Sequence, residues 1–348
     1  MRYLIVTLIF CLTICCKNNQ STNYKDNILN LINIEGNFKY YENSQNYIIK
    51  ENIKTNKKLW AHKKLHEISL KIIASKSKIY YTTPNKIVCI DKSNGEISFL
   101  VKDDFTVNTF NLSLYENEII ATSLLGIFSF SNINGKILWS LLCSNDLLCF
   151  ANPKSIIKDD TIYISGRFKK DNENTLFSYN LKNKKKINEV SLDKKVITNF
   201  EFVQDNLIFG VGQSIHQREI YSINKNNFQI NWKIKNDIDF DSKIVAYKDK
   251  FIYFNFKSKI FELNTNDLKV KKKFVAKNNY QELFNIVDDK LISSDNNSFS
   301  IFSLTNDDTY HFNNIMTSGL QKINCRIYYV NKSNIKTIPN LKITNQNE

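Results

Sequence analysis

The chain has 348 residues and a formal net charge of +14. Its lysines are spread along the sequence in runs such as KTNKK and KVKKK, with no nucleic-acid-binding motif between them. This spread argues against a nucleic-acid partner and leaves an anionic membrane surface or an acidic partner open.

The first predicted element is a signal sequence at residues 1–16. Arg2 supplies a positive charge, and Leu4 to Ile14 is almost wholly apolar. This run is too short for a spanning helix, which needs roughly 20 apolar residues. It ends at Cys15 and Cys16 and resembles a bacterial lipoprotein signal, so Cys16 or Cys15 is the expected site of lipid attachment. A cleaved secretory signal with two incidental cysteines is the alternative.

A polar tether is expected over residues 17–34, followed by one folded domain over residues 35–345. No segment after the signal is long and apolar enough to span a membrane. We therefore expect an exported domain that a lipid anchor holds close to the membrane. A flexible tether of this length reaches about 20 Å on average.

The rest of the chain is built from an internal repeat. Short runs rich in Ile, Phe, Tyr and Val are bounded by Asn, Asp, Lys and Ser, which predicts strands whose turns use Asn and Asp in place of glycine. No long segment has helical periodicity, so helix should be scarce. The runs recur about every 40 residues, in copies that begin at Lys39, Lys78, Glu118, Thr161, Asn206, Lys250, Lys290 and Arg326.

Each copy, together with the short run before it, supplies four antiparallel strands. Four such strands in about 40 residues form one blade of a β-propeller. The predicted fold is therefore an all-β propeller, with eight blades or, if the weak first and last copies combine, seven. We expect the ring to close by mixing strands from both ends of the chain in one blade, because mixing removes an open sheet edge.

The segment GIFSFSNINGKILW, from Gly126 to Trp139, resembles the repeat of the pyrroloquinoline-quinone-type propellers, as does the segment from Asn85 to Phe99. Both segments end in an aromatic residue, and Val190 takes this repeat position in a degenerate copy. At this position we predict residues that pack between blades and do not form a ligand cage: Trp60, Phe99, Trp139, Trp232 and Phe274.

Enzymes of that family hold a quinone and calcium with clustered Glu, Asn and Asp residues, and no such set stands out here. No nucleophile or phosphate-binding motif is present either. We therefore expect a non-enzymatic protein without a cofactor.

The repeat type, the signal type and the length together resemble the BamB family of lipoproteins of the outer-membrane β-barrel assembly machinery. The resemblance implies a scaffold on the periplasmic side of the outer membrane. Its partners would be the BamA-like barrel-forming subunit and nascent outer-membrane proteins. A surface-exposed adhesin or ligand-binding propeller is the alternative, and a redox or hydrolytic propeller enzyme is a third possibility.

Two segments depart from the minimal repeat and are the candidate partner-binding loops. The segment Leu141 to Phe150 is an apolar connection that could instead be the inner strand of the next blade. The segment Gly166 to Thr175 lengthens a hairpin and could be a solvated insertion. The candidate partner-binding residues in these segments are Leu147, Leu148, Phe150, Arg167 and Phe168.

The cysteines and histidines do not predict a metal site. Cys143 and Cys149 could pair in an oxidising compartment, or they could be small buried residues like Cys89 and Cys325. There is no Cys-x-x-Cys motif, and the histidines form no motif with the cysteines.

Overall fold

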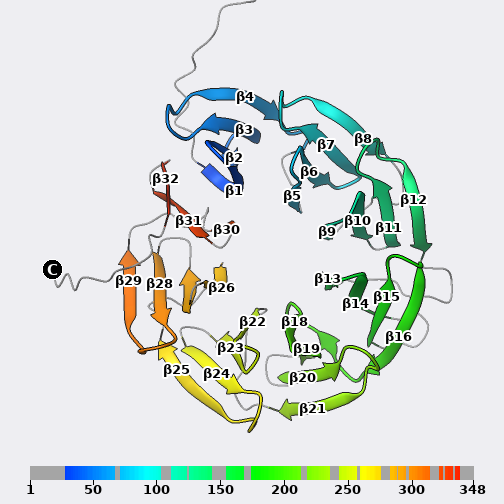
Figure 1. The fold of residues 1–348 in the computed structure, drawn as a ribbon, viewed down its shortest axis with the longest axis vertical. Helices are drawn as coiled ribbons and strands as arrows, with labels where there is room; N and C mark the ends of the chain where they lie inside the picture. Colours follow the sequence, from blue (N-terminus) through cyan, green and yellow to red (C-terminus); the bar gives the residue numbers. More distant parts are fainter. Residues whose placement is uncertain are drawn as a thin grey trace, which may run out of the picture.

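The computed structural model describes the chain in fifteen stretches. These are residues 28–66, 71–102, 111–123, 125–142, 154–167, 174–212, 218–235, 243–256, 259–275, 283–287, 289–294, 298–313, 321–323, 326–331 and 334–337. All regular secondary structure in these stretches is β-strand, arranged in eight antiparallel sheets around a central axis (Figure 1).

The first four sheets are blades 1 to 4, with four strands each. Blade 1 contains β1 (Ile28–Glu35), β2 (Phe38–Asn43), β3 (Tyr47–Asn52) and β4 (Lys58–Lys63). Blade 2 contains β5 (Ile72–Ala74), β6 (Lys78–Thr83), β7 (Lys86–Asp91) and β8 (Ile97–Lys102). Blade 3 contains β9 (Asn111–Tyr115), β10 (Glu118–Ser123), β11 (Gly126–Ser131) and β12 (Ile137–Leu142). Blade 4 contains β13 (Ser155–Lys158), β14 (Thr161–Arg167), β15 (Asn174–Asn180) and β16 (Lys185–Leu192).

The remaining sheets complete the ring. Blade 5 contains β17 (Lys195–Val196), β18 (Glu201–Val203), β19 (Asn206–Gly212), β20 (Arg218–Asn224) and β21 (Ile230–Lys235). Blade 6 contains β22 (Ile244–Tyr247), β23 (Phe251–Phe256), β24 (Lys259–Asn264) and β25 (Val270–Val275). Blade 7 contains β26 (Leu283–Val287), β27 (Lys290–Ser294), β28 (Ser298–Ser303) and β29 (Thr309–Asn313). The eighth sheet has three strands, β30 (Gln321–Ile323), β31 (Arg326–Asn331) and β32 (Asn334–Thr337).

This arrangement confirms the predicted β-propeller fold. Seven blades have at least four strands, and the three-stranded eighth sheet lies between blade 7 and blade 1 (Figure 1). Within a blade, the strands run in chain order from the axis to the outer wall, and in blade 5 both β17 and β18 pair with β19.

The prediction of a mixed closing blade is wrong. Among the described residues, the first sheet contains only N-terminal strands and the eighth only C-terminal strands. The predicted tether also extended too far, because β1 begins at Ile28. Ile28, Leu31 and Ile34 are buried against Tyr41 and Ile49, so the N-terminal repeat supplies its own inner strand and does not need one from the other end of the chain.

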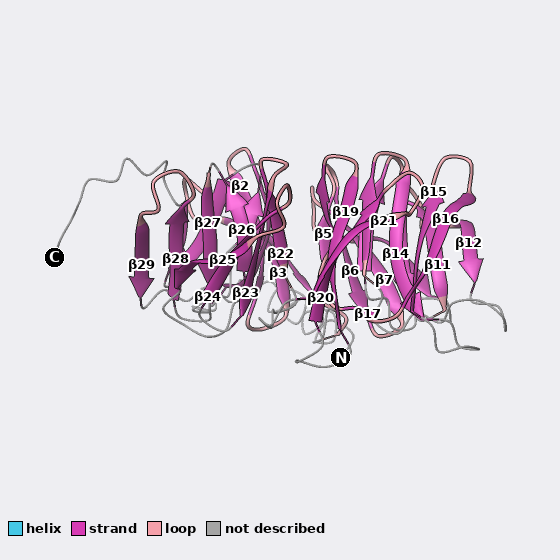
Figure 2. Cartoon of the chain, turned by 90° about the horizontal axis from the view of Figure 1, so that it is seen from below, coloured by secondary structure: helices cyan, strands magenta, loops and turns pink. Residues whose placement is uncertain are grey.

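The strand order gives the ring two different ends (Figure 2). One end carries the turns from the first to the second strand and from the third to the fourth strand, such as the turn between Asn52 and Lys58; we call it the turn end. The opposite end carries the turns from the second to the third strand and the links between blades; we call it the connection end. The chain enters the ring at the connection end, because Ile28 pairs with Asn43 at that end of blade 1.

The turn before each outer strand repeats one backbone conformation. Its fifth residue has a positive φ in all seven blades, at Asn56, Gly95, Gly135, Lys184, Phe228, Leu268 and Asp307. An Asn or Asp side chain often begins the turn: the Oδ1 atoms of Asn52, Asp91 and Asn224 accept backbone N–H bonds from residues two positions later. Asn and Asp side chains form such turns readily, which explains how the chain makes them with few glycines.

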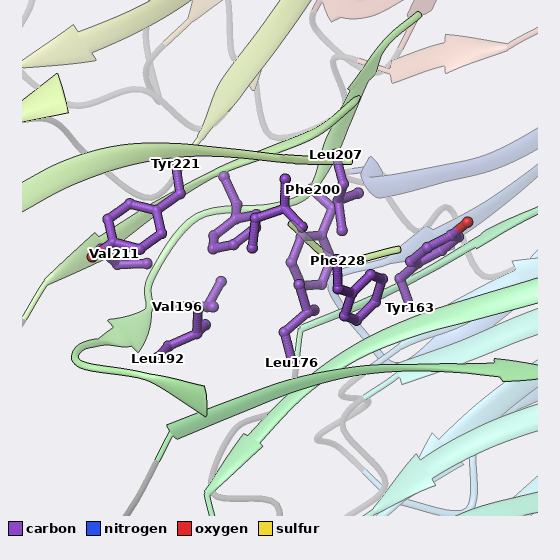
Figure 3. Packing of buried hydrophobic residues seen from close by; sticks show 11 residues of the cluster. Tyr163, Leu176, Leu192, Val196, Phe200, Leu207, Val211, Tyr221 and Phe228 are labelled. Carbon is purple, nitrogen blue, oxygen red and sulfur yellow. The ribbon is translucent and has the colours of Figure 1, made fainter. Parts of the chain in front are cut away.

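The hydrophobic core is divided into clusters between neighbouring blades. One cluster joins Tyr163 and Leu176 of blade 4 to Leu207, Phe209 and Tyr221 of blade 5 (Figure 3). A middle strand is covered on both faces, since a blade lies on each side of it. This is why Ile220, Tyr221, Ser222 and Ile223 of β20 are all buried.

Candidate functional site

Most of the predicted partner-binding residues lie outside the described part of the chain. This holds for Leu147, Leu148, Phe150 and Phe168, as it does for Cys15, Cys16, Cys143 and Cys149. Arg167 is the last residue of β14, where its backbone pairs with Asn174 of β15. The inner strand of blade 4 is β13, which begins at Ser155.

The two candidate segments leave the ring at the same end. The segment that contains Leu147 follows β12, and the last pair of that strand joins Leu142 to Gly126 at the connection end. The longer hairpin of blade 4 begins at the pair of Arg167 and Asn174, also at the connection end. Leu125, in the neighbouring turn of blade 3, is 40% exposed. The two segments that differ from the repeat therefore both start at the connection end of the ring, one in blade 3 and one in blade 4.

The same end carries a basic cluster between blades 4 and 5. Lys194 forms an ion pair with the buried Glu219 at 2.6 Å. Burial lowers the pKa of Lys154, and the positive charge of Lys195 lowers it further. Tyr221, beside this cluster, donates a hydrogen bond to Asp193 at 2.5 Å. A face with clustered lysines and an exposed leucine can present both charge and apolar contact to a macromolecular partner.

The repeat-position aromatics lie between neighbouring blades. The ring of Trp139, in β12, stacks on Tyr179 of blade 4 with ring centroids 5.5 Å apart. Trp232, in β21, packs into the cluster of blade 6 residues that includes Phe261. Phe274, in β25, stacks on Phe302 of blade 7 at 4.8 Å. These side chains hold the ring together and do not form a common site.

Phe274 does not occupy the repeat position that the sequence analysis gave it. Trp60, Phe99, Trp139 and Trp232 each stand four residues after the left-handed residue of the preceding turn. The residue four positions after Leu268 is Lys272, and Phe274 stands two positions further along the same strand. In blade 4 the equivalent residue is Asn188, not Val190. The ladders show this, because Asn188 pairs with Ser178 as Trp139 pairs with Ser129.

At three blade boundaries, the outer residue of one blade and the left-handed residue of the next are complementary in size. A Cβ atom on Gly95 would lie 2.6 Å from the ring of Trp60, and one on Gly135 would lie 2.5 Å from the ring of Phe99. Blade 4 carries the small Asn188 instead, and the left-handed residue of blade 5 is Phe228. That phenyl ring is buried and stacks on Tyr163 at 6.2 Å.

Hydrogen bonds from side chains also bridge the blades. The indole Nε1 of Trp60 and the ammonium of Lys50 both donate to the carbonyl oxygen of Lys92 in blade 2, each at 3.0 Å. Tyr115 donates to Asp160 and Tyr247 donates to Asp289, both at 2.8 Å. Each tyrosine ends an inner strand, and each aspartate lies in the next blade. Strand periodicity alone could not show which polar residues face a neighbouring blade.

His62 makes a further bond between blades 1 and 2. Its Nδ1 lies 3.1 Å from the carbonyl oxygen of Gly95, and its Nε2 lies 3.1 Å from the hydroxyl of Tyr81. Because a carbonyl can only accept, Nδ1 carries the proton and the neutral ring accepts from Tyr81 at Nε2. Burial lowers the pKa of His62 below its ordinary value of 6.5.

The lowered pKa of His62 predicts a loss of stability in acid. Folding favours the neutral ring, so this contribution is complete above pH 6.5 and is lost as the pH falls through the folded-state value. We expect the free energy of unfolding to decline more steeply below that pH in the natural chain than in His62→Gln. Urea titrations between neutral and mildly acidic pH measure the slope. An unchanged slope in His62→Gln would contradict the assignment.

Cys89 of blade 2 is a buried cysteine. Burial raises the pKa of the Cys89 thiol to about 12, which keeps it protonated and unreactive. Within the described stretches, no group of three or more His, Cys, Asp or Glu side chains is placed to hold a metal ion. No helix long and apolar enough to cross a membrane occurs in the same stretches.

The fold and its inter-blade packing define a β-propeller. No protein-family model and no curated protein matches the sequence, so the pyrroloquinoline-quinone-type repeat remains a resemblance. The chain is similar in structure to BamB from Moraxella catarrhalis, with a TM-score of 0.63, 11% identity, and coverage of 88% of this chain and 94% of that one. It is also similar to Sqt1 from Saccharomyces cerevisiae, at TM-score 0.67 and 10% identity over 91% of this chain and 97% of that one. The computationally designed protein Ika8 gives a TM-score of 0.68 and 9% identity, with the same coverages.

Proposed function

We propose that the chain is an exported, lipid-anchored scaffold of outer-membrane β-barrel assembly. In this proposal it has no catalytic role and no cofactor, and it faces the periplasm. It binds a BamA-like barrel-forming subunit and helps nascent outer-membrane proteins to insert. The anchor is the lipid on Cys16 or Cys15.

One observation carries this proposal: the two segments that differ from the repeat extend from blades 3 and 4 at the same end of the ring, the connection end. Loops at one end of a rigid ring are where a scaffold can vary its contacts without disturbing its core. The apolar N-terminal run, which stops at two cysteines, supports export and anchoring. The structural similarity to BamB supports the fold that such a scaffold needs.

A mild-detergent pull-down of the natural protein tests the proposal. We expect the barrel-forming subunit to be recovered. Recovery should fall in a variant with Leu147→Ser, Leu148→Ser and Phe150→Ser, and in one with Arg167→Ala and Phe168→Ala. Ile133→Ser is the matched control, because Ile133 is 74% exposed at the turn end of blade 3, on the opposite face of the ring.

Consistent absence of the barrel-forming subunit from the pull-down would contradict the scaffold assignment. If the subunit were lost only with the Ile133→Ser variant, the contact would lie at the turn end and not at the connection end. Protease treatment of intact cells separates the scaffold from an adhesin, since a periplasm-facing protein resists and a surface adhesin is removed.

A further inference from the structure

A continuous sector of the outer wall is strongly basic. We call it the basic wall: the outer strands β16, β21 and β25 with the turns before them, at residues 181–192, 225–235 and 265–275. These strands follow one another around the ring (Figure 1). Their only acidic residues are Glu189 and Asp267. The lysines of the basic wall are Lys182, Lys184, Lys185, Lys186, Lys225, Lys233, Lys235, Lys269, Lys271, Lys272 and Lys273.

Protection of the sheet edges does not explain this charge. Lysines on an outer strand discourage pairing with another chain, but every blade has an exposed outer edge. The corresponding stretch of blade 3, residues 132–142, has Lys136 as its one lysine, and that of blade 7, residues 304–313, has none, whereas that of blade 1, residues 53–63, has four lysines but stands apart from blades 4 to 6. A β-bulge next to the outer strand is already present in blades 3 to 6. The basic wall therefore carries more charge than edge protection requires.

Much of this charge is not neutralised within the fold. Ion pairs hold some of the lysines, such as Lys186 to Glu189 at 2.5 Å and Lys273 to Asp307 at 2.6 Å. Six others have no described carboxylate within ion-pair distance, and all six are exposed. The six are Lys184, Lys185, Lys233, Lys235, Lys269 and Lys272. Free positive charges that face outward attract an anionic partner.

Apolar side chains are interspersed with these lysines. Ile187 is 47% exposed, Ile230 is 45% exposed and Val275 is 52% exposed, one on each outer strand of the basic wall. Lysine presents a point charge without the two-pronged geometry with which arginine recognises a single carboxylate or phosphate. Flexible lysines around exposed isoleucine and valine suit a surface of many mobile anionic groups above an apolar layer.

We propose that the basic wall binds the anionic headgroups of a lipid bilayer, so that the ring lies with blades 4 to 6 against the membrane. This binding is additional to the proposed lipid anchor and does not require it. Each lysine near an anionic surface contributes only a small part of the binding free energy, and salt screens the contribution. Several lysines together are therefore needed for measurable binding.

Vesicle co-sedimentation tests the proposal with the full chain carrying Cys15→Ser and Cys16→Ser, which removes both possible lipidation sites. Vesicles of phosphatidylcholine with phosphatidylglycerol are compared with vesicles of phosphatidylcholine alone. The wall variant carries Lys184→Gln, Lys185→Gln, Lys235→Gln and Lys272→Gln. The control carries Lys54→Gln, Lys57→Gln, Lys58→Gln and Lys63→Gln in blade 1, and it loses the same net charge.

We expect binding to the anionic vesicles that weakens as salt is added. The wall variant should bind at least about tenfold more weakly, and the blade 1 control should keep most of the binding. The apolar N-terminal run is the same in all variants, so it cannot produce the difference. Thermal unfolding of each variant shows whether it is folded. The salt dependence of vesicle binding by the protein with its natural basic wall tests the proposal without any substitution in the wall.

Equal loss in both variants would show a general effect of net charge and would overturn the proposal. Equal binding to both kinds of vesicle would overturn it too. If soluble polyglutamate bound through the same lysines while anionic vesicles did not, the basic wall would be a site for an acidic protein. None of these outcomes depends on whether the barrel-forming subunit is recovered in the pull-down, so the two proposals can fail separately.

Discussion

Replacing Trp139 with alanine should lower the free energy of unfolding by about 3 kcal/mol, the lower end of the range for large aromatic residues, because the side chain is half-buried. The indole stacks on Tyr179 of the next blade, and its Nε1 donates to the carboxylate of Glu118 at 2.9 Å. The substitution removes the stacking surface and one hydrogen bond at the boundary between blades 3 and 4. Equilibrium unfolding in urea measures the change.

Leu138→Ala is the matched control for Trp139→Ala. Leu138 precedes the tryptophan in β12 and is 47% exposed, so its truncation should change the free energy of unfolding by no more than about 0.5 kcal/mol. A Trp139→Ala protein of natural stability that no longer captured a partner would show that Trp139 belongs to a binding site and not to the packing between blades.

Replacing Gly95 with alanine should destabilise the protein by about 2–5 kcal/mol, from two sources. Gly95 has a φ of +79°, and the left-handed conformation costs about 1–2 kcal/mol for a residue with a Cβ atom. That atom would also lie 2.6 Å from two ring carbons of Trp60, and overpacking of this kind costs about 1–3 kcal/mol. The free energy of unfolding in urea again measures the sum.

Two further variants separate the two sources. Gly36 also has a positive φ, +55°, but a Cβ atom there would have no neighbour within 4 Å, so Gly36→Ala should show the backbone cost alone. In a Trp60→Leu background, Gly95→Ala should cost about 1 kcal/mol less than in the natural chain, because the ring it strikes is absent. If the two alanine substitutions cost the same, and the Trp60→Leu background made no difference, the contact between Gly95 and Trp60 would not be a source of the destabilisation.

The fold could be predicted because each blade repeats a local pattern. Turn residues such as Asn134 and Gly135, followed by a short apolar run to Trp139, mark the third and fourth strands without reference to the rest of the chain. The inner strand of blade 1 was missed because its apolar residues, Ile28, Leu31 and Ile34, are not in strict alternation. The ladder between β1 and β2 has register shifts at these positions, and such irregularities break the period of two.

The pairing between blades was much harder to predict. Val190 and Phe274 were assigned to the repeat position from their apolar character, whereas the ladder of blade 4 places Asn188 there and the spacing from the left-handed Leu268 places Lys272 there in blade 6. Hydrophobicity is a poor guide at this position because the contact depends on both partners. Where the outer residue is small, as at Asn188, the large Phe228 of the next blade fills the space.

For the candidate surfaces, the sequence predicted which segments depart from the repeat, and the ring decided where they meet. The segments that contain Leu147 and Arg167 are joined to strands that end on the same face of blades 3 and 4. The basic wall follows from the same geometry. Its lysines are scattered over about 90 residues of sequence, and they become neighbours because the fourth strand of every blade lies at the outside of the ring.

The sequence by itself determined the strand class, the repeat and the residues that turn the chain, since these depend on contacts between near neighbours. Only the tertiary structure decided how the first and last copies meet, which residues lock one blade to the next, and which charges share a surface. Those contacts join residues that belong to different copies of the repeat. Their energies depend on the size and charge of both partners, so neither partner's sequence segment reveals them alone.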